Sequence, residues 1–113
     1  MHELGIAEEI LGIVLAEAER NQAKKVSAIR LRVGVVRAIE PEQLSFIFDH
    51  IARKTLAEGA ALEIEEVPVR VVCAACGEME SRSFAWECPK CKGYEISVQG
   101  GDALEIVSVD IEV

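Results

Sequence analysis

Residues 27–35 read SAIRLRVGV and alternate between apolar and polar side chains. Ile29, Leu31 and Val33 fall on one face, and two arginines fall on the other. A period of two residues is typical of a strand that buries one face. Such a strand needs a covering layer, and the segments on both sides of it can supply one.

Amphipathic helices are predicted before and after this strand. Over residues 4–20, apolar side chains recur at the helical period of 3.6 residues. A second helix is expected to start at Pro41, because proline at the first helical position loses no hydrogen bond and the neighbouring acids favour the positive end of the helix dipole. Gly59 is its expected stop. The apolar face of this helix consists of Leu44, Ile47, Phe48, Ile51 and Thr55.

Two further strands are predicted to complete the sheet. The first begins near Leu62 and changes the parity of its apolar residues near Glu66, which predicts a bulge or twist. The last runs from Leu104 to Val113 and also changes parity. We therefore expect these two strands to be antiparallel partners that carry the intervening segment at one end. The predicted fold class is α/β, a three-stranded mixed sheet with two helices on one face and an inserted ribbon module.

The inserted module carries two CxxC pairs that are separated by eleven residues, and its cysteines are Cys73, Cys76, Cys88 and Cys91. This spacing is typical of a tetrahedral four-thiolate zinc site, which is structural because no position is left for water. Gly77 and Gly93 follow the two pairs and permit positive φ in their turns. Zinc binding is expected to contribute about 10–16 kcal/mol to local folding. A rubredoxin-like iron site and a pair of disulfides are the alternatives.

The ribbon is predicted to span residues 71–99, inserted before the last strand of an α/β domain formed by residues 1–70 and 100–113. Its loop carries three large apolar side chains, and we expect them to cap the thiolates rather than to form a binding platform. They are Met79, Phe84 and Trp86.

Charge and composition exclude several classes of function. Twenty acids against twelve bases give the 113-residue chain a formal charge of −8, which disfavours nucleic-acid binding. The chain contains no apolar run long enough to span a membrane, and no base precedes Arg20, so we expect a cytoplasmic protein. We find no nucleophile–base pair, phosphate loop or catalytic carboxylate cluster, so an enzyme is not expected. The bases between Arg20 and Ala38 form either a docking surface for an acidic partner or cross-strand pairs with Glu63 and Glu65.

The amino terminus reads Met1-His2-Glu3. The α-amine of Met1, the amide nitrogen of His2 and its ring Nδ1 can close fused chelate rings around one ion in a planar arrangement, which selects Ni(II) or Cu(II). Glu3 could complete the square through its backbone nitrogen or its carboxylate. The alternative is a solvated histidine with no ligand role.

Several segments together resemble the HypA/HybF family of nickel-incorporation proteins over essentially the whole chain. They are MHELGIA at 1–7, VG at 33–34, EPEQL at 40–44, the paired CxxC motifs and GDALEI at 101–106. The chain departs from the family at Gly5, where serine is common, and in the closing segment, where a tighter Gly-x-Glu-Leu is common. The resemblance implies delivery of Ni(II) for maturation of [NiFe]-hydrogenase and, in some organisms, of urease.

The resemblance also implies residue roles and partners. His2 would be the nickel ligand, Met1 would supply the amine and Glu3 would support them, while the four cysteines would hold structural zinc. Glu40 would lie beside nickel or cap a helix. The implied partners are a HypB-type GTPase, the hydrogenase large-subunit precursor and urease maturation proteins.

Two side chains of the second predicted helix lie opposite its apolar face. We expect His50 to be solvated and Phe46 to form a patch for a partner or a homodimer. Rival functions are a zinc-ribbon adaptor without labile metal and an iron electron carrier.

Overall fold

A computed structural model describes residues 3–82 and 86–113, which form two compact units. The first unit contains the chain up to Leu31 together with Ile39–Glu65 and Glu105–Val113. The second unit contains Arg32–Ala38 and Glu66–Leu104. The boundaries expected from the sequence, a ribbon at residues 71–99 inserted into an α/β domain of residues 1–70 and 100–113, stay a prediction.

Two helices cover the first unit, α1 (Glu3–Arg20) and α2 (Pro41–Ile51). Pro41 is the first helical residue of α2, as predicted, and Glu40 precedes it as N-cap. The apolar periodicity over residues 4–20 places Leu4 on the buried face of α1, but Leu4 is 51% exposed. The buried positions of α1 are Glu3, Ala7, Ile10, Val14 and Ala18.

Helix α2 ends at Ile51, well before the predicted stop at Gly59. The Thr55 hydroxyl donates to the carbonyl of Ala52 at 2.6 Å, and the Thr55 N–H donates to the same carbonyl at 3.1 Å. Threonine side chains that bond nearby backbone groups compete with helical hydrogen bonding. The prediction was wrong here because Thr55 closes a turn instead of continuing the apolar face.

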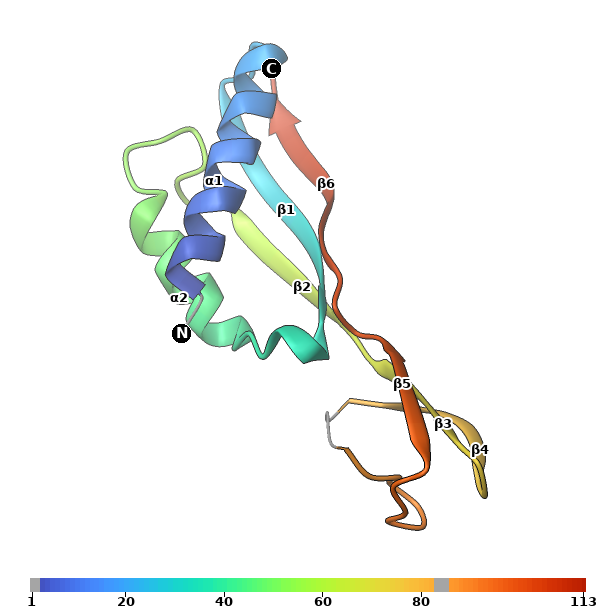
Figure 1. Ribbon diagram of the computed structural model, residues 1–113. Helices are drawn as coiled ribbons and strands as arrows, with labels where there is room; N and C mark the ends of the chain where they lie inside the picture. Colours follow the sequence, from blue (N-terminus) through green and yellow to red (C-terminus); the bar gives the residue numbers. More distant parts are fainter. Residues whose placement is uncertain (1–2, 83–85) are drawn as a thin grey trace. The chain divides into compact units, whose positions relative to one another are not determined.

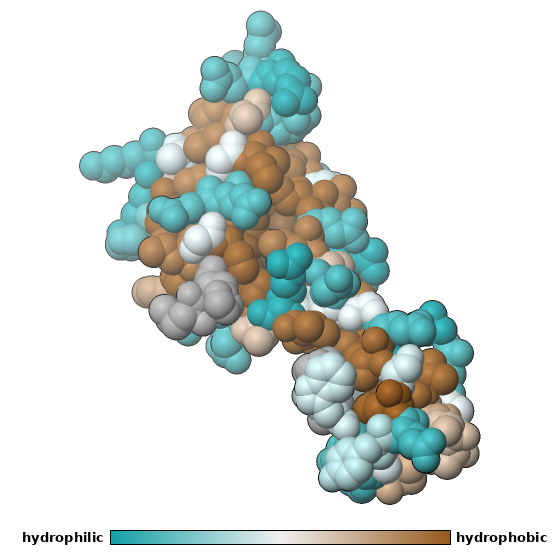
Figure 2. All heavy atoms as spheres, viewed as in Figure 1, coloured by the Kyte–Doolittle hydropathy of each residue, from teal (hydrophilic) through white to brown (hydrophobic). Residues whose placement is uncertain are grey.

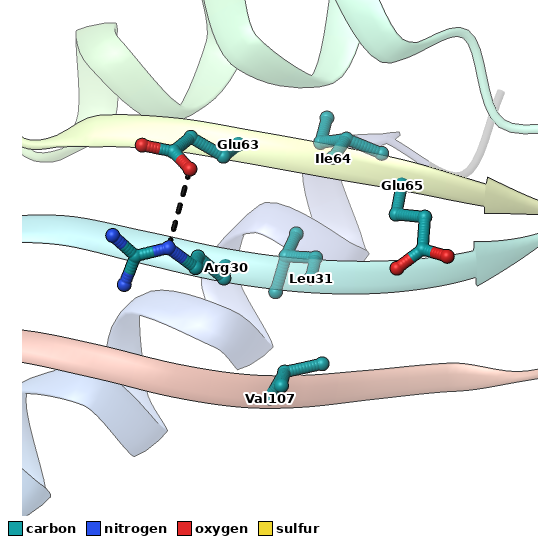
Figure 3. A pocket seen from close by; sticks show the side chains of 6 residues that line it. All are labelled: Arg30, Leu31, Glu63, Ile64, Glu65 and Val107. Atoms are coloured by element: carbon teal, nitrogen blue, oxygen red, sulfur yellow. Dashed lines mark ion pairs between the residues drawn. The ribbon is translucent and has the colours of Figure 1, made fainter.

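The predicted three-stranded mixed sheet is confirmed in the first unit. Its strand order is β2-β1-β6. Strands β1 and β2 run in the same direction (Figures 1 and 3). Strand β6 runs in the opposite direction (Figure 1). Both helices lie behind the sheet in Figure 3, so they cover one face, as predicted. The strands are β1 (Lys25–Gly34), β2 (Ala61–Val67) and β6 (Leu104–Glu112).

The two outer strands, β2 and β6, are not paired with each other, because β1 lies between them. The expectation that they are antiparallel partners was therefore wrong. The predicted long strand breaks at Pro68 into β2 and β3 (Val69–Cys73), and β3 belongs to a second sheet. Proline has no N–H to donate to a ladder, so it ends the pairing of β2. The change of parity near Glu66 marks this change of sheet rather than a bulge.

The second unit is a three-stranded antiparallel sheet with the order β4-β3-β5. Strand β3 pairs with β4 (Gly77–Ser81) on one side and with β5 (Ile96–Gly100) on the other. The last residue of β3, Cys73, lies opposite Gly77 in one neighbour and Ile96 in the other. This short sheet therefore delivers Cys73 to the end where the other three cysteines lie.

A close contact between two glycines joins distant segments of the second unit. The N–H of Gly34 donates to the carbonyl of Ala103 at 2.7 Å, and the N–H of Val36 donates to that of Gly101 at 2.8 Å. A Cβ on Gly34 would overlap the backbone of Gly101, whose own φ is +74°. Both positions therefore require glycine.

Candidate metal centre

The structure brings the four predicted cysteines of the second unit together. Cys73 ends β3, Cys76 lies in the turn before β4, and Cys88 and Cys91 lie in the loop before β5. Their Sγ atoms all lie within 4.8 Å of one another. Among the described residues, this is the cluster of His, Cys, Asp or Glu side chains that could hold a metal ion.

The sulfur geometry fits a tetrahedral ion. The Sγ atoms of Cys73 and Cys91 are 3.7 Å apart. Zn–S bonds of about 2.3 Å in a tetrahedron place two sulfurs about 3.8 Å apart, whereas a disulfide would need about 2.05 Å. Four tetrahedral thiolates suit zinc or iron, and they leave no open position for catalysis.

The two turns that carry the cysteines reach positive φ at different residues. Gly77 has φ +87°, as predicted for the first turn. In the second turn the left-handed residue is Lys92, at φ 64°, and not Gly93. Glycine at position 93 instead leaves room for the sulfur of Cys91. The Gly93 N–H points at Cys91 Sγ at 3.4 Å, and a Cβ on Gly93 would lie 3.2 Å from the same sulfur.

Backbone hydrogen bonds act on the pKa of one cysteine of the second pair, Cys88. The N–H groups of Cys91 and, to a lesser degree, Lys90 lower the pKa of Cys88 to about 6, although burial opposes them. The Lys90 N–H lies 3.4 Å from Cys88 Sγ. Hydrogen bonding with Cys91, followed by burial, raises the pKa of Cys76 to about 12. A metal ion that binds four thiolates must displace the protons of these thiols.

The predicted N-terminal site is described only at Glu3, because Met1 and His2 lie outside the described residues. Glu3 is 5% exposed. Its Oε2 accepts a hydrogen bond from the backbone N–H of Glu40 at 3.2 Å. Glu3 and Glu40 are thus adjacent in the first unit, although 37 positions separate them in the sequence. The family resemblance implies that Glu40 lies near the nickel site, whereas the apolar periodicity gives no sign of this contact.

Several large side chains are exposed at the surface of the two units. Trp86 is 70% exposed, and the expectation that it caps the thiolates stays a prediction. Met79 lies in β4 and is half-buried, and Phe84 lies outside the described residues. Phe46 is 74% exposed and His50 is exposed, as predicted. Figure 2 shows further apolar surface between scattered hydrophilic side chains on the helical side of the first unit.

The face of the first sheet opposite the helices carries a shallow groove of about 320 Å³, and Arg30 crosses it (Figure 3). The Nε of Arg30 lies 3.2 Å from Glu63 Oε1, and its Nη1 lies 3.0 Å from Asp110 Oδ1. The hydrogen bond to Asp110 raises the pKa of Arg30 most strongly. The predicted cross-strand pair with Glu63 is confirmed. Arg30 is therefore engaged within the sheet rather than offered to an acidic partner.

No helix in the described part of the chain is both long enough and apolar enough to cross a membrane.

The sequence matches known proteins over its whole length. The profile of the family described as "Hydrogenase/urease nickel incorporation, metallochaperone, hypA" matches residues 1–111. A protein named hydrogenase maturation factor HypA from Chlorobium limicola is 44% identical over 113 residues, covering 99% of this chain and 97% of that protein. Hydrogenase maturation factor HypA 2 of Bradyrhizobium diazoefficiens is 36% identical, covering 99% of this chain and all of that protein.

A solved structure shares the fold. The solution structure of the Ni metallochaperone HypA from Helicobacter pylori aligns with a TM-score of 0.66 at 20% identity, covering 99% of this chain and 98% of that one. At this identity the match speaks for the fold alone.

Proposed function

This chain belongs to the HypA family, the nickel metallochaperones of hydrogenase maturation, and on that premise we propose that its two units handle different metals. The second unit holds a structural zinc ion, and the amino terminus of the first unit carries labile nickel. The observation that carries this proposal is the full-length family match combined with a separate, closed cluster of four cysteines. If zinc occupies the four cysteines, nickel must bind at a different site.

We propose zinc as the ion of the cysteine cluster because it is redox-inert and takes four thiolates in a tetrahedron. The 3.7 Å separation of two sulfurs supports a tetrahedral ion, and the donor set alone leaves iron as a rival. When bound, zinc would cross-link the two cysteine turns of the second unit and would not take part in a reaction. The backbone N–H groups of Lys90 and Gly93 point at the sulfurs of the second turn and offset their negative charge.

We propose that nickel is bound at the amino terminus by the α-amine of Met1 and by the amide nitrogen and ring Nδ1 of His2. Glu3 is the supporting ligand. Glu3 is also the first residue of α1, where backbone N–H groups have no partner within the helix. A metal-binding tip of two residues is thus attached directly to a fixed helix start. A terminal site of this kind is open to a partner protein, which suits transfer of the ion.

The proposed partners are a HypB-type GTPase and the hydrogenase large-subunit precursor, with urease maturation proteins as further recipients, and the proposed location is the cytoplasm. Phe46 is proposed as part of the surface that meets a partner or a second copy of the chain, because a 74% exposed phenylalanine favours an interface. A Phe46→Ala variant should weaken self-association or partner binding. Unchanged values of both would remove Phe46 from the proposal.

The nickel site is tested by titrating the untagged, zinc-loaded protein with Ni(II) and recording its absorption spectrum. We expect one planar, diamagnetic nickel ion per chain. His2→Ala and the addition of residues before Met1 should both abolish it, since each removes a nitrogen ligand. His50→Ala is the matched control, because His50 is the other of two histidines in the chain and is exposed on α2. Binding that survives both changes would contradict the site.

One observation favours a second function, that of an adaptor that binds only protein. Trp86 and Tyr94 of the second unit are 70% and 79% exposed, and both residue types are enriched in interfaces. An adaptor would bind its partner through these side chains and would ignore nickel. The titration described above therefore separates the two functions, and a colourless, redox-silent protein would exclude the third alternative, an iron electron carrier.

A further inference from the structure

Glu3 is the charged side chain that the described part of the molecule buries. It occupies the first of the core-facing positions of α1, which continue through Ala7, Ile10, Val14 and Ala18. A carboxylate in such a position loses hydration, and this cost must be offset by hydrogen bonds or by favourable charge. The surroundings of Glu3 supply both.

The compensation comes from the start of α2. Glu3 Oε2 accepts the backbone N–H of Glu40, the N-cap residue of α2, at 3.2 Å. Glu3 also stands in the first turn of its own helix. Its carboxylate therefore lies at the positive ends of two helix dipoles, where a negative charge is stabilised.

We infer that the Glu3 carboxylate is a positioning group, which ties the first turn of α1 to the start of α2 and so fixes the helix start that follows Met1 and His2 in the chain. This inference rests on the proposed nickel site and refines it. One carboxylate oxygen of Glu3 accepts the Glu40 N–H, and on this inference Glu3 supports nickel through its backbone nitrogen. The side chain acts on nickel through the position of the backbone and not by coordination.

The tie matters because a chelating tip gains affinity when its atoms are already in place. Without an anchor the first turn of α1 would fray, as helix ends do, and nickel binding would have to order it. Groups that orient metal ligands typically affect affinity ten- to hundred-fold. Loss of the tie should therefore weaken nickel binding and also loosen the nickel-free protein.

Two substitutions at one position separate anchoring from coordination. Glu3→Gln keeps an oxygen that can accept the Glu40 N–H but removes the carboxylate, whereas Glu3→Ala removes both. We expect Glu3→Gln to keep the planar nickel spectrum and the parent affinity, with a small decrease in the thermal midpoint of the nickel-free protein. Glu3→Ala should bind nickel roughly ten- to hundred-fold more weakly and should melt clearly earlier without nickel.

Glu8→Gln is the matched control, because it changes an exposed carboxylate of the same helix and leaves both Glu3 and the Glu40 N–H in place. It should match the parent protein in both measurements. The inference is overturned if Glu3→Gln and Glu3→Ala lose nickel equally, or if Glu3→Ala melts at the parent temperature. Failure of the nickel site itself is recognised separately, since His2→Ala would then bind nickel like the parent. In that case the melting temperatures of the two Glu3 variants still decide whether the tie exists.

Discussion

The Sγ atoms of Cys73 and Cys91 lie 3.7 Å apart, although they belong to different turns of the second unit. Cys73 also lies opposite Ile96 of β5 in the strand register. A metal ion between these sulfurs would therefore cross-link the end of β3 to the loop that leads into β5. Metal binding and strand pairing support each other, because each brings the same two segments together.

Removal of one ligand should dismantle this arrangement. We expect Cys73→Ser to lose zinc and to unfold the second unit, since structural zinc contributes about 10–16 kcal/mol in comparable sites. The measurements are metal content per chain and the emission of Trp86, which is the one tryptophan in the sequence. Lys90→Ala is the control, because it keeps the backbone N–H that points at Cys88 Sγ. A Cys73→Ser protein with full zinc content and parent emission would refute the four-thiolate site.

Lys92 offers a stabilising substitution. Its φ of 64° is left-handed, a conformation that costs a non-glycine residue about 1–2 kcal/mol. We expect Lys92→Gly to raise stability by up to about 1 kcal/mol, with part of the gain lost to the greater freedom of glycine in the unfolded chain. Zinc release by a chelator should become slower. Lys90→Gly, made in the same loop at a residue without positive φ, should not show this gain.

Several features of the fold could be predicted because they depend on local chemistry. Pro41 marks the start of α2, and the alternation of residues 27–35 marks β1. The two CxxC pairs locate the cysteine cluster, since each pair needs only its own turn. Each of these features depends on residues that are close together in the sequence, and the structure confirms all three.

Other features depend on contacts that a sequence pattern does not contain. The change of parity near Glu66 predicts a bulge, but the missing N–H of Pro68 decides where one sheet ends and the other begins. Glu3 takes a core position that apolar periodicity assigned to Leu4, because its partner is a backbone N–H 37 positions away. Lys92, and not Gly93, has the left-handed backbone conformation, because the geometry of the turn sets φ at each position.

Arg30 should contribute little to stability in spite of its contacts. Its side chain is 43% exposed, and those of Glu63 and Asp110 are 56% and 49% exposed, so solvent screens both ion pairs. We expect Arg30→Gln to change the unfolding midpoint only slightly, and less at high salt than at low salt. The neighbouring substitution Leu31→Ala should cost about 2–5 kcal/mol, because Leu31 is 1% exposed. Comparable losses in the two variants would show that the Arg30 ion pairs stabilise the sheet more than surface pairs usually do.

The contact between Gly34 and Gly101 gives the sharpest test of the second unit. A Cβ on Gly34 would overlap the carbonyl group of Gly101 and approach the nitrogen of Asp102, and backbone atoms cannot move aside as a flexible side chain can. We expect Gly34→Ala to lower stability by at least about 3 kcal/mol, because the two segments must separate and lose their hydrogen bonds. Gly12→Ala is the matched control, since a Cβ on Gly12 of α1 meets nothing within 4 Å and alanine favours a helix by up to about 1 kcal/mol. Urea unfolding of the zinc-loaded proteins should therefore move in opposite directions for the two variants. If Gly34→Ala were as stable as the parent, the close approach of these two segments would be wrong.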